Sequence, residues 1–91
     1  MIATLEEAKL FLRIDHSDED TLITDLLKTS EDLCKDIIRQ EFTELETIPK
    51  TLKTAVLYGV TYLYENREKA DHKELTQTLS YLLFGIRKEI F

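Results

Sequence analysis

The sequence has few of the residues that make tight turns, cross-link a fold or bind metals through sulfur. With 2 glycines and 1 proline it cannot supply the frequent tight turns of an all-β chain, so we expect helices. A single cysteine, Cys34, excludes an internal disulfide and a cysteine-based zinc site. Because Cys34 falls within an apolar pattern of helical period, we expect a buried, structural thiol.

Long hydrophobic runs are also missing. No apolar stretch approaches the roughly 20 residues that a membrane-spanning helix needs. Residues 1–7 lack the basic start and the apolar stretch of a signal peptide. The sequence therefore predicts a soluble protein of a reducing cytoplasm, with no membrane partner.

Length and charge narrow the class of protein further. The 91 residues are expected to form one domain, 1–91, whose small core would gain from oligomerisation. A net charge of −6 argues against a broad nucleic-acid-binding surface, because binding to phosphates depends on lysine and arginine.

Capping signals and hydrophobic periodicity predict the first two helices. The first starts at Thr4, which forms a capping box with Glu7, and is followed by a break at 14–16. Its apolar face contains Leu5, Ala8, Phe11 and Leu12. The second starts near Ser17 or Asp18 and runs to about residue 40. Its apolar stripe contains Leu22, Ile23, Leu26, Leu27, Ser30, Leu33, Cys34, Ile37 and Ile38, and its polar face includes Asp25, Lys28, Glu31, Asp32, Lys35, Asp36 and Arg39.

Two further helices are predicted after a connection at 41–48. Pro49 suits the first position of the third helix, whose run 55–64 is apolar on nearly every side. Gly59 within that run indicates close approach of a neighbouring helix. The fourth helix covers 73–83 and ends at Phe84–Arg87. The predicted fold is all-α, a small bundle of about four helices with an extended or short-helical C-terminal segment.

One dense group of potential metal ligands precedes the second helix. It consists of Asp15, His16, Asp18, Glu19 and Asp20. A calcium loop would need a glycine and a distant glutamate at fixed spacing, which are missing, so helix capping explains the acids better. No nucleophile elbow, catalytic triad or phosphate-binding glycine loop is present. We therefore expect no catalytic residues, no cofactor, no metal and no enzyme.

Three tyrosines of the third helix admit more than one interpretation. Tyr58, Tyr62 and Tyr64, with Arg67 nearby, could form a stacking platform for nucleic acid. Few cations accompany them, which favours a role in the protein core or in a subunit contact.

Three blocks of the chain share a pattern with one protein family. Residues 5–27 contain L-E-E-A-K, L-R-I-D, a group of acids and then L-I-x-x-L-L. Residues 48–68 contain I-P-K-T-L-K-T-A and Y-E-N-R-E, and residues 83–87 read L-F-G-I-R. In this order the blocks resemble the head–tail connector (adaptor, or head completion) proteins of long-tailed double-stranded DNA phages. Leu83 departs from the family, which has proline there.

The resemblance implies a virion assembly protein and no enzyme. Members assemble as a homo-oligomeric ring, dodecameric in the virion, between the portal protein and a stopper or tail-completion protein. The ring extends the channel after DNA packaging, so DNA only passes through it. The implied locations are the head–tail interface of the virion and, during assembly, the host bacterial cytoplasm.

The same resemblance implies which residues contact a neighbouring subunit or the portal. These candidates are Tyr62, Tyr64, Glu65, Arg67, Phe84 and Arg87. For Tyr62, closing the subunit's own core is an equal alternative.

A different class of function remains open from the composition. The chain could be a small acidic protein-binding regulator, either a DNA mimic or an antitoxin-like module. Such a protein would need carboxylates spaced like phosphates on one face. Acids and bases are instead interleaved along the second predicted helix, which favours the connector.

Overall fold

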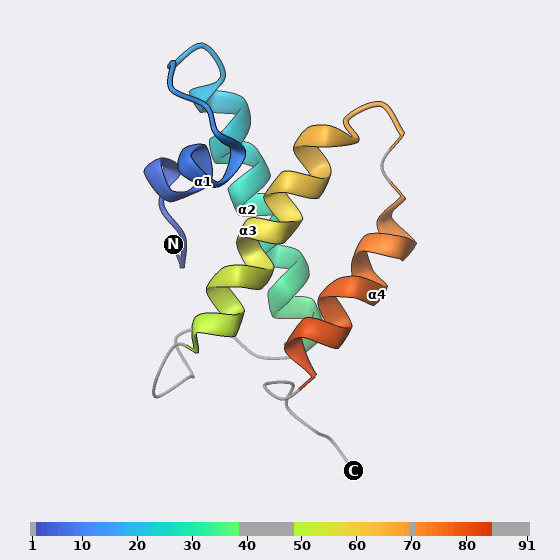
Figure 1. The fold of residues 1–91 in the computed structure, drawn as a ribbon. Helices are drawn as coiled ribbons and strands as arrows, with labels where there is room; N and C mark the ends of the chain where they lie inside the picture. Colours follow the sequence, from blue (N-terminus) through green and yellow to red (C-terminus); the bar gives the residue numbers. More distant parts are fainter. Residues whose placement is uncertain (1, 39–48, 70, 85–91) are drawn as a thin grey trace.

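The computed structural model describes residues 2–38, 49–69 and 71–84, and within these ranges the regular structure is entirely helical (Figure 1). The helices are α1 (Leu5–Leu12), α2 (Asp20–Ile38), α3 (Lys50–Glu65) and α4 (His72–Leu83). The all-α prediction is confirmed. The predicted connection at 41–48 and the predicted C-terminal segment after Phe84 lie outside the described residues.

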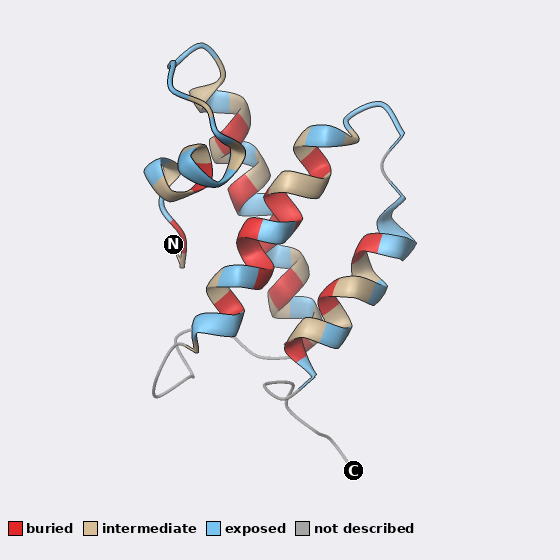
Figure 2. Ribbon diagram, viewed as in Figure 1, coloured by how far each residue is buried: buried red, intermediate tan, exposed pale blue. Residues whose placement is uncertain are grey.

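The central pair of the bundle is α2 and α3. Helix α1 packs against both on one side, and α4 packs against both on the other (Figure 1). The buried residues turn toward the space shared by the helices, as Figure 2 shows. The largest fully buried hydrophobic side chains are Ile23, Leu27, Ile38, Leu52, Val56, Val60, Leu75, Leu79 and Leu83.

Helix α1 begins with the predicted capping box. Thr4 Oγ1 accepts the Glu7 N–H at 3.1 Å, and a Glu7 carboxylate oxygen accepts the Thr4 N–H at 2.9 Å. Arg13 caps the end of the helix: its φ of 62° is left-handed, and its N–H donates to the Leu10 carbonyl. Both ends are therefore fixed by local hydrogen bonds.

The predicted apolar face of α1 was wrong at Phe11. Ala8 is buried, and Leu5 and Leu12 pack against the core, whereas Phe11 is 50% exposed and Leu10 is 79% exposed. Because the buried face is centred on Ala8 and Leu12, Phe11 lies at its edge. Two large apolar side chains of α1, Leu10 and Phe11, are thus left exposed beside the core-facing Leu5 and Leu12.

The predicted start of α2 was too early by two or three residues. A turn precedes the helix, in which the Asp20 N–H donates to the Ser17 carbonyl at 3.3 Å. The Glu19 carbonyl then accepts the first helical hydrogen bond, from Ile23, at 2.9 Å. Glu19 therefore stands at the helix start, with its side chain free for another contact.

The assignment of Glu31 to the polar face was also wrong. Glu31 is buried, one turn from both Leu27 and Cys34, because its carboxylate meets the N-terminal segment. Its Oε2 accepts the backbone N–H of Ile2 at 2.7 Å, and the neighbouring Ala3 is fully buried. Glu31 thus supplies an acceptor to a chain segment that makes no helix of its own.

Pro49 precedes α3 instead of opening it. With φ −66° and ψ 147° it is extended, and its carbonyl accepts the Leu52 N–H at 3.1 Å. Within α3, the close helix approach predicted at Gly59 is confirmed. A Cβ at this position would lie 2.1 Å from Ser30 Oγ of α2, and that hydroxyl donates to the Val56 carbonyl at 2.7 Å.

Helix α4 starts one residue before its predicted first residue. Asp71 caps it, since its Oδ1 accepts the N–H groups of Lys73 at 3.0 Å and Glu74 at 3.1 Å. Leu75, Leu79 and Leu83 form its buried stripe at helical spacing. The predicted apolar face is confirmed for these three.

The Cys34 thiol is buried, as predicted, and should be unreactive in the folded protein. Burial raises the pKa of Cys34 to about 12, and the charge of Glu31 adds to the effect. Because the thiolate is the reactive form, a thiol reagent at neutral pH should modify Cys34 only after unfolding. The check is labelling with a disulfide reagent, with and without denaturant. Rapid labelling of the native protein would contradict a buried thiol.

Candidate functional site

Two of the predicted contact residues, Tyr64 and Arg67, lie together near the end of α3. The Tyr64 hydroxyl donates to Glu19 Oε1, and Arg67 Nη1 donates to Glu19 Oε2 at 3.1 Å. The Arg67 guanidinium also lies 4.7 Å from the centroid of the Tyr64 ring. These three side chains connect the α1–α2 turn to the end of α3, which are 45 residues apart in the chain.

The hydrogen bonds of this cluster shift the pKa values of Glu19 and Tyr64 in opposite directions. The hydrogen bond from Tyr64, followed by the bond and charge of Arg67, lowers the pKa of Glu19 below its ordinary value of 4.5. The same bond, with partial burial and the Glu19 charge, raises the pKa of the Tyr64 hydroxyl above 10.0. The folded protein therefore favours an ionised Glu19 and a protonated Tyr64.

We expect Glu19 to make stability depend on acid pH. Because its pKa is lower in the folded state, its contribution is present above the ordinary carboxyl range and is lost as pH falls below it. Glu19→Gln should therefore show a smaller fall in melting temperature than the parent protein between about pH 6 and about pH 3. Circular dichroism melting curves would measure it.

A matched control for this experiment is Glu65→Gln. Glu65 is exposed, and its side chain makes no hydrogen bond or ion pair within the part of the chain that the structure describes. The control should keep the acid dependence of the parent protein. If Glu19→Gln and Glu65→Gln reduce the acid dependence of the melting temperature equally, the Glu19 cluster does not cause this dependence.

Tyr62 also contacts its own subunit. Its hydroxyl accepts the Asp71 N–H at 3.1 Å, and its proton can reach the Asp71 carbonyl at 3.3 Å or Glu74 Oε2 at 3.5 Å. The side chain therefore joins α3 to the first turn of α4. The ring is half-buried against the core, so Tyr62 serves the packing of the subunit.

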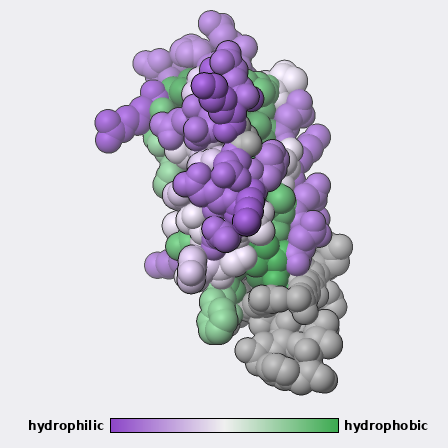
Figure 3. Space-filling view, turned by 90° about the vertical axis from the view of Figure 1, so that its right-hand side faces the viewer, coloured by the Kyte–Doolittle hydropathy of each residue, from purple (hydrophilic) through white to green (hydrophobic). Residues whose placement is uncertain are grey.

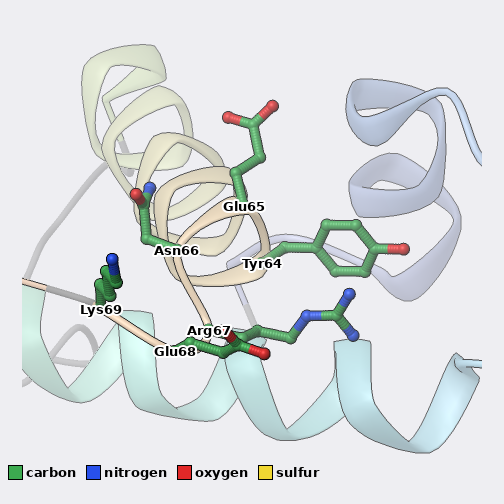
Figure 4. A pocket seen from close by; sticks show the side chains of 6 residues that line it. All are labelled: Tyr64, Glu65, Asn66, Arg67, Glu68 and Lys69. Carbon is green, nitrogen blue, oxygen red and sulfur yellow. The ribbon is translucent and has the colours of Figure 1, made fainter.

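A shallow hollow of about 310 Å³ opens at the end of α3, around the Y-E-N-R-E segment. It is lined by Tyr64, Glu65, Asn66, Arg67, Glu68 and Lys69 (Figure 4). Tyr64 and Arg67 extend in the same direction, whereas the Glu65 carboxylate points elsewhere. Acidic and basic side chains alternate here, which suits polar contact with another protein surface.

Phe84, directly after α4, is the only exposed aromatic residue among the described candidates. It is 72% exposed, and Tyr81, one turn earlier, is 85% exposed. Both line a groove of about 360 Å³ with Thr76, Gln77 and Ser80. Figure 3 faces this side of the molecule, where hydrophobic residues (green) show in separate places between hydrophilic ones. Arg87, the last candidate, lies outside the described residues.

The tyrosines, Arg67 and Phe84 do not form one site. Tyr62 and Tyr64 hold neighbouring segments, while Phe84 lies at the far end of α4 (Figure 1). The sequence interpretation missed Glu19 and Tyr81. Glu19 could not be found from its spacing, because its partners are distant in the chain. Tyr81 had a usable signal, since it lies opposite the Leu79 and Leu83 stripe of α4.

The described residues contain neither a metal-ion cluster nor a membrane-spanning helix. No group of three or more histidine, cysteine, aspartate or glutamate side chains there could hold a metal ion. In the same ranges, no helix has the length and apolar character needed to cross a membrane.

A family of known proteins matches nearly the whole chain. The family model of the phage gp6-like head-tail connector proteins matches residues 2–91. Neither the comparison with curated proteins nor that with solved structures gave a match. The family match spans all four helices and both segments that carry the candidate contacts.

Proposed function

The chain belongs to the phage gp6-like head-tail connector family, and from this premise we propose that it assembles as a ring between the portal and the tail components. Family membership gives it a structural role in a phage virion, at the junction of head and tail. In the proposal, residues 1–91 act as one connector domain. The ring extends the DNA channel after packaging, and DNA passes through without specific binding.

The observation that carries the proposal is the family match over residues 2–91, nearly the whole chain. The proposed partners are further copies of the chain, the portal protein and a stopper or tail-completion protein. Assembly takes place in the host bacterial cytoplasm. The role needs no catalysis, only a stable subunit with outward contacts.

The six candidate residues divide into two roles within this proposal. Tyr62, Tyr64 and Arg67 fix the shape of the α3 end through contacts inside the subunit. Glu65 and Phe84 are exposed and are proposed to contact a neighbouring subunit or the portal. Arg87 is proposed as a contact from its place in the family pattern.

Native mass spectrometry would test the function, on the protein alone and mixed with the portal protein of its own genome. A ring, or a stoichiometric complex with the portal, is expected. A ring that forms only with the portal would fit as well, because a template raises the local concentration of weakly associating subunits. A monomer that does not bind the portal would contradict the proposal.

A further inference from the structure

We infer that neighbouring subunits join head to tail, through the α1 surface (Leu10 and Phe11) of one copy and the α4 surface (Tyr81 and Phe84) of the next. The inference rests on the proposed ring and names the two faces that form it. Both surfaces belong to the described part of the chain, and neither contributes to the subunit's core.

Exposure of large apolar side chains is concentrated in these two places. The described residues include five exposed large hydrophobic side chains, and four of them form the α1 and α4 surfaces. The fifth, Tyr58, is the least exposed at 38%. Covering an exposed leucine or phenylalanine side chain is favourable, because it removes apolar surface from water. Two adjacent pairs therefore mark contact surfaces better than scattered residues would.

The packing of α1 holds its apolar residues outward. The helix is anchored by buried Ala8 and by two ion pairs, Lys9 to Asp20 at 2.8 Å and Glu7 to Lys53 at 2.7 Å. A helix of 8 residues is not stable alone, so these contacts set its orientation. The orientation exposes Leu10 and Phe11.

Helices α1 and α4, which carry the two surfaces, lie on opposite sides of the α2–α3 pair (Figure 1). A closed ring of identical subunits needs two different, complementary faces on each copy, since a face that contacts itself gives a dimer. An α1 surface on one side and an α4 surface on the other meet this requirement. The occupant of each surface is therefore a second copy of this chain.

Charge favours the same pairing. Residues 2–20, which include the α1 surface, carry six acidic and two basic side chains, a net charge of −4. Residues 76–84, which include the α4 surface, carry no charge. Because each copy has a net charge of −6, contacts between like acidic faces are repulsive. The acidic α1 end of one copy meets least repulsion at the α4 end of the next.

Cysteine cross-linking tests the contact directly. The variant Leu10→Cys/Tyr81→Cys, mixed with the portal protein and mildly oxidised, should give a ladder of covalent dimers, trimers and larger oligomers. The native Cys34 is buried and does not compete. The matched control, Thr29→Cys/Tyr81→Cys, replaces an exposed residue of α2 and should give no ladder. Equal ladders from both variants, or none from the first, would overturn the inference.

A mixing experiment separates a head-to-tail contact from a contact of like faces. Leu10→Glu/Phe11→Glu keeps the α4 surface, and Tyr81→Glu/Phe84→Glu keeps the α1 surface. With the portal protein present, neither variant alone should form a ring, but an equimolar mixture should form a dimer through the intact pair. Failure of the mixture to associate would contradict the pairing.

The outcomes distinguish this inference from the proposed function. A ring of the parent protein without the cysteine ladder would leave the connector role standing and refute these two faces. A parent protein that forms neither a ring nor a portal complex would refute both.

Discussion

Replacing Gly59 with valine is expected to destabilise the subunit by about 4 kcal/mol. A Cβ at this position would lie 2.1 Å from Ser30 Oγ and 3.1 Å from Ser30 Cβ, so α2 and α3 could not keep their distance. Overpacking typically costs about 1–3 kcal/mol. Turning the Ser30 hydroxyl away would also break its buried bond to the Val56 carbonyl, at a cost of about 1–3 kcal/mol.

Urea denaturation, followed by circular dichroism, would measure the loss. A domain of this size is stable by only about 5–15 kcal/mol, so the valine variant would lose a large part of its stability. An effect below about 1 kcal/mol would show that the helices separate cheaply and that glycine is not required.

The cause can be isolated with alanine variants. Gly59→Ala is expected to lower the free energy of unfolding by about 2 kcal/mol. The steric penalty is offset by about 1 kcal/mol, because alanine favours the helix more than glycine does. In a Ser30→Ala background the clashing oxygen is gone, so the cost of Gly59→Ala should fall by at least about 1 kcal/mol. Simple additivity of the two substitutions would contradict a contact between these residues.

Features with local causes could be predicted from the sequence. The Thr4 capping box needs only residues three apart, and the α2 stripe follows from helical spacing. Gly59 could be interpreted because a glycine within an apolar helix indicates close packing. The function could be predicted as well, because the three blocks that resemble the connector family follow one another along the chain.

Features that depend on distant partners could not be predicted. Glu31 follows the polar pattern of α2, but the N-terminal segment, 29 residues away, covers it. Glu19 looked like a helix-start acid, and its contacts with Tyr64 and Arg67 arise only when α3 returns to the α1–α2 turn. The exposure of Phe11 depends on how α1 is rotated on its neighbours, which periodicity over 8 residues does not determine.

Phe84→Ala is expected to abolish ring or portal assembly while leaving the subunit as stable as before. Phe84 is 72% exposed, so removing its ring leaves no cavity in the core. At an interface, truncating a buried aromatic anchor typically costs about 2–4 kcal/mol, roughly a 30- to 1,000-fold loss of affinity per contact. In a ring the loss recurs at each subunit contact. Native mass spectrometry with the portal protein would measure assembly, and thermal melting would measure stability.

The adjacent Leu83 provides the matched control, because it is fully buried while Phe84 is exposed. Leu83→Ala should cost about 2–5 kcal/mol of folding stability through the cavity it leaves among α2, α3 and α4. At a temperature where it is still folded, it should assemble normally. The two substitutions therefore distinguish a core residue, Leu83, from a proposed contact residue, Phe84, at adjacent positions of the chain. If Phe84→Ala lowers the melting temperature as much as Leu83→Ala does, Phe84 belongs to the core and its proposed contact role fails. If it changes neither stability nor assembly, neither neighbouring subunits nor the portal bind at this end of α4.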